Sequence, residues 1–278
     1  MKPQLLVPFY TFAEADNTAT IQAAVSVAEH LGGDVDALLL EPDLPTVASP
    51  LANMLLDLSA MANDIRAKCR ARGEDILAGF TTELADREIT FRDLQVACTP
   101  GGLIDLVSEH ARYRDLILCG LGGSDPIVRS IAEAAVFEAG RPTILVPEAH
   151  SEVNFSHVAI AWDASRVAAR AIADAHMFLD KAQRITIISA LDEKPLGPDK
   201  PAHRLAAFLS RQGRQAEVSQ VSCKGRPIGE TLQAHARENG AGLLVMGGFG
   251  HSRLREFVIG GATTGVLDKA ILPVLMSH

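Results

Sequence analysis

Residues 243–253 read LLVMGGFGHSR, and the pair Gly260-Gly261 follows this segment. The apolar run before the glycines is typical of a buried strand, and the glycine loop leads into a helical pattern. Glycine lets the main chain approach an anion closely because it has no Cβ, and a helix N-terminus adds N–H donors with a partial positive charge. The order strand, glycine loop, helix therefore predicts a phosphate-binding loop.

The composition is that of a globular protein with an acidic balance. The chain has 278 residues, of which 47% are hydrophobic and 22% are charged, so it is long enough for two domains with ordinary cores. Its formal net charge is −8, and Lys and Arg form no cluster. These values disfavour nucleic acid and anionic membranes as partners and favour a small molecule or another protein.

Targeting and membrane-spanning signals are not found in the sequence. Residues 1–8 are too short and too soon interrupted by proline to form a signal peptide, and no apolar run reaches membrane-spanning length, so we expect a cytoplasmic protein. The cysteines have no CxxC spacing and the histidines no metal-binding spacing. We therefore expect buried reduced thiols and no metal site. The cysteines are Cys69, Cys98, Cys119 and Cys223.

The chain repeats itself at the length of a domain. An offset of 125 residues places Cys98 on Cys223 and His110-Ala111-Arg112 on His235-Ala236-Arg237. With a two-residue insertion Gly120 and Gly123 then fall on Gly247 and Gly250, and further on, after a longer loop in the second repeat, Pro142 falls on Pro273. Such a period indicates a duplicated domain rather than a solenoid. Because residues 147–152 are polar and typical of a turn, we place one repeat at 1–148 and the other at 153–278.

Apolar runs of strand length alternate with helical patterns in both repeats. The expected strands of the first repeat are residues 5–8, 35–40, 90–97, 116–119 and 143–146. Those of the second repeat are 158–161, 185–189, 217–222, 242–246 and 274–277, with helices at 166–180, 203–212, 228–239 and 262–270. This alternation predicts an α/β fold of two similar five-stranded, doubly wound parallel sheets, which bind ligands at the carboxyl ends of their strands.

The first repeat is longer between its second and third strands. Residues 42–45 lead there into a helical stretch at 54–85, long enough for an extra turn or a lid. Its Met and Leu residues recur at helical spacing, which fits core packing or a groove for a partner.

The glycine spacing resembles that of the universal stress protein family. The second repeat carries Gly247-x2-Gly250-x9-Gly260 between its fourth expected strand and helix, and the family's nucleotide-binding members carry G-x2-G-x9-G followed by Ser or Thr. The resemblance covers the whole chain as a tandem pair of UspA-type domains with the adenine nucleotide alpha hydrolase-like fold. It implies that the two repeats pair through their last strands, 143–146 and 274–277, around a pseudo-two-fold axis.

The resemblance also implies where a nucleotide would lie in the second repeat. Asp163 corresponds to the position at the adenine and ribose, Ala190 lines the adenine pocket, and Met246 and Gly247 pass along the ribose. The other implied contacts are Ala161, Trp162, Gly250, His251, Ser252, Arg253, Gly260, Gly261 and Ala262. The chemistry of these residues agrees, because a carboxylate accepts bonds from ribose hydroxyls, small apolar residues leave a slot for a purine, and glycine N–H groups bind phosphates.

Two of these residues have a second interpretation. His251 lies in the glycine loop and is either a phosphate contact or a solvent-facing residue. Trp162, the only tryptophan, is either a core residue or a neighbour of the purine, whose binding would quench its fluorescence.

The second repeat departs from the family pattern at one position. Where the nucleotide-binding members have Ser or Thr, this chain has Gly261, so a hydroxyl donor to the phosphates is missing. One lost hydrogen bond to a charged group costs about 1.5–3 kcal/mol. We expect weaker binding unless Ser252, Thr263 or Arg253 supplies the bond.

The first repeat departs further. Tyr10 stands where the second repeat has Asp163, and Arg129-Ser130 stand where it has Gly260-Gly261, with a loop four residues shorter. The glycines at 120–123 lack the spacing of a dinucleotide-binding loop and fit a tight turn. We expect a closed or misshapen cradle there, and therefore one nucleotide site per chain.

The sequence thus predicts a stress-response protein whose second repeat binds ATP or a related adenine nucleotide, with or without Mg²⁺, and which regulates a protein partner. Since no positioned base or metal-binding carboxylate accompanies Asp163, any ATP hydrolysis is expected to be slow. The alternative is an interaction or chaperone-like module that binds no nucleotide, in which both sites have decayed. Besides the pairing of the two repeats within one chain, a homodimer of two chains is compatible with the sequence.

Overall fold

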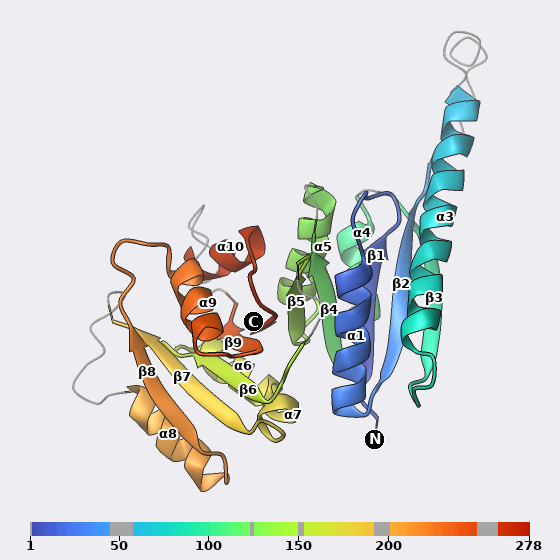
Figure 1. Cartoon of the computed structure of the whole chain (residues 1–278). Coiled ribbons are helices and arrows are strands. Elements are labelled where there is room, and N and C mark those ends of the chain that lie inside the picture. The colour runs from blue at the N-terminus through green and yellow to red at the C-terminus, as the bar shows by residue number, and fades with distance from the viewer. Residues whose placement is uncertain are drawn as a thin grey trace.

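The computed structural model describes residues 2–44, 58–99, 101–122, 125–149, 153–191, 201–248 and 261–278. These residues form a ten-stranded sheet with helices on both faces (Figure 1). The first repeat contains β1 (Gln4–Tyr10), α1 (Thr18–Leu31), β2 (Asp34–Pro42), α3 (Leu58–Glu83), β3 (Phe91–Cys98), α4 (Leu103–Ala111), β4 (Leu116–Leu121), α5 (Pro126–Phe137) and β5 (Thr143–Pro147). The second repeat contains β6 (His157–Ala161), α6 (Arg166–Asp174), α7 (His176–Leu179), β7 (Arg184–Ala190), α8 (Pro201–Arg211), β8 (Ala216–Val221), α9 (Ile228–Glu238), β9 (Leu243–Gly247), α10 (Gly261–Asp268) and β10 (Val274–Ser277).

The strand order confirms the predicted doubly wound class. Along the sheet the strands lie in the order β3-β2-β1-β4-β5-β10-β9-β6-β7-β8, and the pairs within each repeat are parallel. The winding reverses between β1 and β4 and again between β6 and β9. A doubly wound sheet opens its ligand crevice at such a reversal, at the carboxyl ends of the strands.

The two five-stranded sheets join through antiparallel pairing of β5 with β10, which confirms the predicted junction. The register pairs Thr143 with Met276, Ile144 with Leu275 and Leu145 with Val274. Ile144 and Leu275 are the second residues after the equivalent prolines Pro142 and Pro273, so each lies opposite its own counterpart. The pseudo-two-fold axis between the repeats therefore passes through this pair.

Two apolar layers cover the sheet, and each contains residues of both repeats. Strand side chains alternate between them, so that Leu5 and Val7 face the layer of α1, α3, α6, α7 and α8, whereas Leu6 faces the layer of α4, α5, α9 and α10. At the junction Leu275 belongs to the first layer and Met276 to the second. Both hydrophobic cores thus continue from one repeat into the other.

Two helices differ from the sequence prediction in extent. The helix expected at 166–180 is divided into α6 and α7 at Ala175, whose ψ of 3° leaves the helical region. Of the helix expected at 54–85, the structure describes α3, whose 26 residues correspond to about 40 Å. Ile76 and Phe80 bury one part of α3 in the core, and the N-terminal part extends beyond the sheet (Figure 1).

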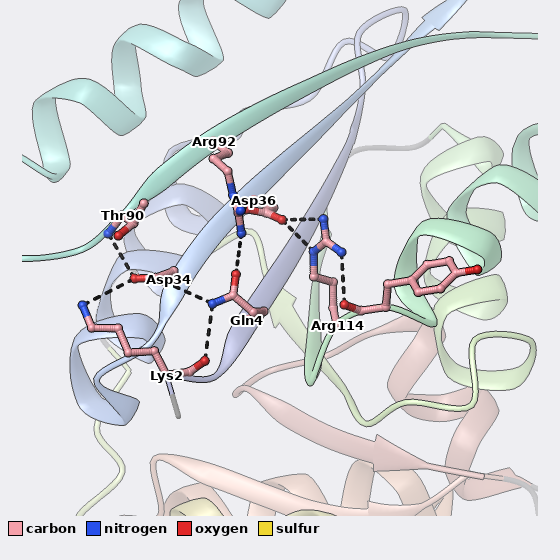
Figure 2. A network of polar contacts seen from close by, with 8 residues as sticks. Lys2, Gln4, Asp34, Asp36, Thr90, Arg92 and Arg114 are labelled. Atoms are coloured by element: carbon pink, nitrogen blue, oxygen red, sulfur yellow. Dashed lines mark hydrogen bonds and ion pairs between the residues drawn. The ribbon is translucent and has the colours of Figure 1, made fainter.

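A buried carboxylate lies near the amino end of the first repeat's strands (Figure 2). Asp36 on β2 is 1% exposed, and its oxygens accept hydrogen bonds from Arg92 Nε at 2.8 Å and Arg114 Nε at 2.6 Å. Such partners are needed because removing a charge from water costs several kcal/mol. The second repeat has Thr186 at this register position, and the Thr186 hydroxyl lies 2.8 Å from His157 Nε2. At this buried position the first repeat therefore has a carboxylate paired with two arginines, whereas the second has a hydroxyl beside a histidine.

Aromatic rings join the repeats on the face covered by α1. The His30 ring stacks on Phe178 with centroids 5.9 Å apart and planes inclined by 3°, and it lies 4.6 Å from Phe155. His30 and Phe178 each lie 13 residues after the N-cap that begins their helical segment, so this is a second contact between equivalent positions. His30 Nε2 is buried without a hydrogen-bond partner among the described residues. Burial lowers the pKa of His30, and the nearby charge of Lys181 lowers it further.

We expect His30→Phe to raise the free energy of unfolding by about 1 kcal/mol at neutral pH, because an unpartnered ring nitrogen is replaced by an apolar ring. Folding lowers the pKa of His30 below its ordinary 6.5, so below that pH the unfolded state binds more protons and the wild type loses stability. The variant escapes this loss, and the difference between the two proteins should widen from about pH 7 to about pH 5. Chemical denaturation across this range measures it.

The exposed His203→Phe serves as the control for the type of substitution. Some pH dependence should remain in His30→Phe, because burial also lowers the pKa of His157. Parallel pH profiles for the wild type and His30→Phe would contradict the assigned role of the His30 contact.

Candidate functional site

The carboxyl ends of β6, β7 and β9 lie side by side at one edge of the second repeat. β6 pairs with β7 on one side and with β9 on the other, with Ala161 opposite Ile188 and Ile160 opposite Val245. Since the three strands are parallel, the chain leaves the sheet after Ala161, Ala190 and Gly247 at the same edge. The structure thus brings the predicted residues on these strands together at the point where the winding reverses.

Bonds to β7 hold the residue that follows β6. The Trp162 N–H donates to Ile188 O at 2.9 Å, and Ser189 Oγ donates to Trp162 O at 3.2 Å. The Trp162 side chain packs against the core on the α1 face, and its buried indole Nε1 has no acceptor among the described residues. The Trp162 side chain therefore packs against the core, while its backbone lies at the carboxyl ends of the strands.

Asp163 presents an exposed carboxylate at this edge. Its Oδ1 accepts a hydrogen bond from the Ser165 N–H at 2.9 Å, and Ser165 caps α6 by accepting from the Ala168 N–H at 3.2 Å. Between them Ala164 has a φ of 62°, a left-handed conformation that costs a residue with a Cβ about 1–2 kcal/mol. The turn fixes one carboxylate oxygen against the start of α6, so the side chain is oriented before any ligand arrives.

Gly247 ends β9 directly against the first turn of α6. A Cβ at this position would lie 2.6 Å from Ala168 N and 2.6 Å from Val167 C, so no larger residue fits without moving backbone. The sequence pattern assigned Gly247 to the path of the ribose, and the contact with α6 gives it a packing role as well. Met246, beside it, is buried.

Gly248 brings the end of β9 against the first repeat. A Cβ here would lie 3.1 Å from Val136 Cγ1 and 3.3 Å from Phe137 Cε1, both on α5. The Gly248 N–H donates to Ser277 O at 2.8 Å, and the Gly248 carbonyl lies 3.0 Å from His278 Nδ1. The first repeat therefore helps to position the chain that leads into the glycine loop.

The start of α10 packs closely against the start of α9, a contact that was not predicted from the sequence. A Cβ on Gly229, at the start of α9, would lie 2.5 Å from Ala262 O, and one on Gly265 would lie 3.4 Å from Gly229 Cα. Gly261, by contrast, is exposed, and a Cβ there would meet only Ile228 Cγ2 at 3.8 Å. Gly229 belongs to no recognisable sequence motif, so its role in helix packing is seen only in the folded structure.

Five predicted contacts lie outside the described residues. They are Gly250, His251, Ser252, Arg253 and Gly260. Their phosphate contacts stay predictions from the family pattern.

The corresponding edge of the first repeat is nearly filled. The cavity at the ends of β1 and β4 has a volume of about 30 Å³, compared with the roughly 300–1,000 Å³ of small-molecule sites. Thr20, the third residue after its N-cap as Ala168 is in the second repeat, lies so close that a Cβ on Gly120 would be 2.2 Å from Thr20 Oγ1. Leu40 takes the register position of Ala190 and is fully buried.

The polar groups at this edge of the first repeat are also different. Tyr10 stands in the place of Asp163, and burial raises the pKa of its phenol, with Cys98 and Asp125 adding to the effect. Asp125 caps α5 by accepting from the Ile127 N–H at 2.8 Å, and Pro126 has no N–H to offer. The N-terminus of α5 therefore presents a negative charge and few free donors to an anion.

The described residues contain no group of three His, Cys, Asp or Glu side chains arranged to hold a metal ion. All four cysteines are buried, and burial raises the pKa of Cys119 to about 12, which leaves its thiol unreactive. Among the described helices none is both long and apolar enough to cross a membrane.

The repeat that carries the glycine motif matches a known protein family. Residues 154–278 match the model of the Universal stress protein family. The second repeat therefore belongs to the universal stress protein family. A short segment of 46 residues is also 46% identical to the universal stress protein Slr1230 of Synechocystis, and this match spans 16% of either chain.

Solved universal stress proteins share the fold of the whole chain. One from Archaeoglobus fulgidus is 17% identical, with a TM-score of 0.69 over 99% of this chain and 97% of that chain. The protein PA1789 of Pseudomonas aeruginosa, described as functionally unknown, is 17% identical, with a TM-score of 0.61 over 99% and 92% of the two chains. A universal stress protein solved in complex with cAMP covers 44% of this chain, with 21% identity and a TM-score of 0.35. The full-length matches show that the two-repeat arrangement is a known form of this fold.

We expect Gly247→Ala to lower the free energy of unfolding by about 1–3 kcal/mol, because the new methyl group forces α6 away from β9. Gly261→Ala is the matched control, since the same methyl group enters open space and improves helix propensity. Chemical denaturation of both variants measures the effect. Equal stability of the two variants would show that α6 does not press on Gly247.

Proposed function

We propose that the second repeat of this universal stress protein binds ATP or a related adenine nucleotide at the edge formed by β6, β7 and β9. The observation that carries the proposal is the placement of the exposed Asp163 and the backbone of Gly247 and Gly248 at the reversal of the winding. A doubly wound sheet binds its ligand at that position. The nucleotide-bound state would then regulate an interaction with a protein partner.

The residues present at this edge fit the parts of an adenine nucleotide. The free oxygen of Asp163 can accept from a ribose hydroxyl, while Ala161 and Ala190 leave space for a flat purine. The start of α10 offers backbone donors and a partial positive charge to phosphates. Gly250 and Gly260 would complete the cradle, and Mg²⁺ could accompany the phosphates.

The first repeat supports a single site per chain. The space between the ends of β1 and β4, about 30 Å³, has no room for a nucleoside. A neighbouring cavity of about 530 Å³ is lined by Asp125 at the start of α5, whose carboxylate would repel a phosphate. The repeat that matches the family model is the one that carries the glycine motif. Both observations support the proposal that a nucleotide binds to the second repeat.

A thermal-shift series with ATP, AMP, cyclic AMP and GTP tests the proposal. Ligand at about one hundred times its dissociation constant adds about 2.7 kcal/mol of stability, which corresponds to several degrees for a protein of this size. Quenching of Trp162 fluorescence should accompany the shift, because Trp162 stands beside Asp163. No shift with any adenine nucleotide at millimolar concentration would favour the alternative, a module that binds no nucleotide.

The location of the site is tested by a pair of variants in the two repeats. Gly250→Trp should abolish the shift with ATP, because a large side chain blocks the glycine loop. Gly123→Trp alters the corresponding glycine of the first repeat and should leave the shift intact. Loss of the shift in both variants would contradict a single site in the second repeat.

Gly261→Ser should tighten nucleotide binding by about 10- to 100-fold, because it supplies the hydroxyl donor that family members have at this position. The structure has room for it, since a Cβ at residue 261 meets only Ile228 Cγ2 at 3.8 Å. Gly261→Ala adds the same Cβ without the hydroxyl and should change affinity little. Isothermal titration with ATP separates the two, and equal affinities would mean that another residue already makes this bond.

A further inference from the structure

A groove with a volume of about 700 Å³ lies on the second repeat between α6 and α7 on one side and α8 on the other. Its apolar lining includes Trp162, Ala169, Ile172, Ala173, Leu205 and Phe208. The Phe208 side chain is 43% exposed, although a large aromatic ring gains free energy from burial. Among the described residues, the groove is therefore an apolar surface that stays partly uncovered.

Three arginines and one histidine lie beside these apolar residues. The groove is also lined by Arg204, Arg211, Arg214 and His176, and no Asp or Glu belongs to the described lining. Arg214 is held by Asp180, whose Oδ1 accepts from Arg214 Nε at 2.8 Å. Arg211 is exposed in the last turn of α8. This positive lining stands out on a chain whose formal net charge is −8.

The equivalent groove of the first repeat has the opposite charge. It lies between α1 and α3, has a volume of about 610 Å³, and is lined by four carboxylates and one arginine. These residues are Glu14, Asp16, Asp75, Glu83 and Arg72. Because both grooves occupy the same place in the fold, the fold alone does not account for the arginines of the second one.

We propose that the groove between α6–α7 and α8 binds an amphiphilic anion, a small molecule with one carboxylate or phosphate group on an apolar body. Its volume lies within the range of small-molecule sites, and its apolar lining with a few charged groups has the composition of such sites. The apolar body lies against Ile172, Leu205 and Phe208. The anionic group is bound by guanidinium groups, which donate two parallel hydrogen bonds to a carboxylate or phosphate.

This site is separate from the proposed nucleotide site. Among the predicted nucleotide contacts that the structure describes, only Trp162 lines the groove, and no described residue of β7 or β9 contributes to it. The two proposals therefore stand or fall independently.

The test uses decanoate, below its micellar concentration, with full-length protein and isothermal titration. Decanol and decyltrimethylammonium have the same chain length without charge and with a positive charge. Decanoate should bind with one-to-one stoichiometry, and the other two compounds should bind at least tenfold more weakly. Equal binding of decanol would overturn the proposal, because the cationic lining would then contribute nothing. Displacement of decanoate by ATP would overturn the separation of the two sites.

A matched pair of variants tests the position of the site. Arg211→Glu and Arg237→Glu each remove an exposed arginine from the last turn of a helix, but Arg237 lies on α9, on the opposite face of the sheet. Arg211→Glu should weaken decanoate binding about tenfold or more, whereas Arg237→Glu should leave it unchanged. Equal effects of the two substitutions would overturn the assignment. Arg211→Gln, which removes the charge without reversing it, should give an intermediate loss and replaces the Glu variant if that fails to fold.

Discussion

The antiparallel pairing of β5 with β10 is the contact on which the remainder of the structure depends. It turns two sheets into one and lets both apolar layers continue across the junction. It also places α5 of the first repeat beside the end of β9, where Val136 and Phe137 lie against Gly248. Arg129 of α5 forms an ion pair with Asp268 of α10. The first repeat thus shapes both ends of the segment that carries the glycine motif.

The two repeats share a scaffold but differ at the edge where a ligand would bind. Gly120 and Gly247 are equivalent, and in each repeat a Cβ would collide with the first turn of the helix that follows the repeat's first strand, which is α1 or α6. Helix packing therefore requires glycine at this position in both repeats, independently of any ligand. The differences lie around it, where the first repeat has Tyr10 and the buried Leu40 and the second has the exposed Asp163 and the small, partly exposed Ala190. After a domain is duplicated, the two copies can keep the same fold while the residues at their strand ends change independently.

Much of the fold could be predicted from the sequence because its signals are local. Apolar runs flanked by glycine and proline located all ten strands to within a few residues, and the equivalence of Pro142 and Pro273 identified the joining strands. The pair Asp125-Pro126 is also a typical N-terminal signal of a helix, and α5 begins there. Within the candidate site, the strand ends near Asp163 and Gly247 followed from the same local patterns and from the family spacing.

Contacts between distant segments could not be predicted in this way. The packing of Gly229 against Ala262 depends on how closely α9 and α10 approach, and neither residue has a local signature. The charge of the groove beside α8 depends on which face of α8 turns toward α6, and the stacking of His30 on Phe178 depends on the position of the axis. Each of these features joins residues whose proximity only the folded chain determines.

The contact between His30 and Phe178 has a consequence for the evolution of such proteins. In a symmetric dimer of identical chains, a residue on the two-fold axis meets a copy of itself, so any substitution changes both partners at once. Two histidines that became charged there would repel each other, and no mixed pair could arise. Covalent fusion of the two copies removes this restriction, because each partner is then encoded separately. A polar ring opposite an apolar one, on an axis that also passes through Ile144 and Leu275, is an arrangement that an unfused ancestor could not have adopted.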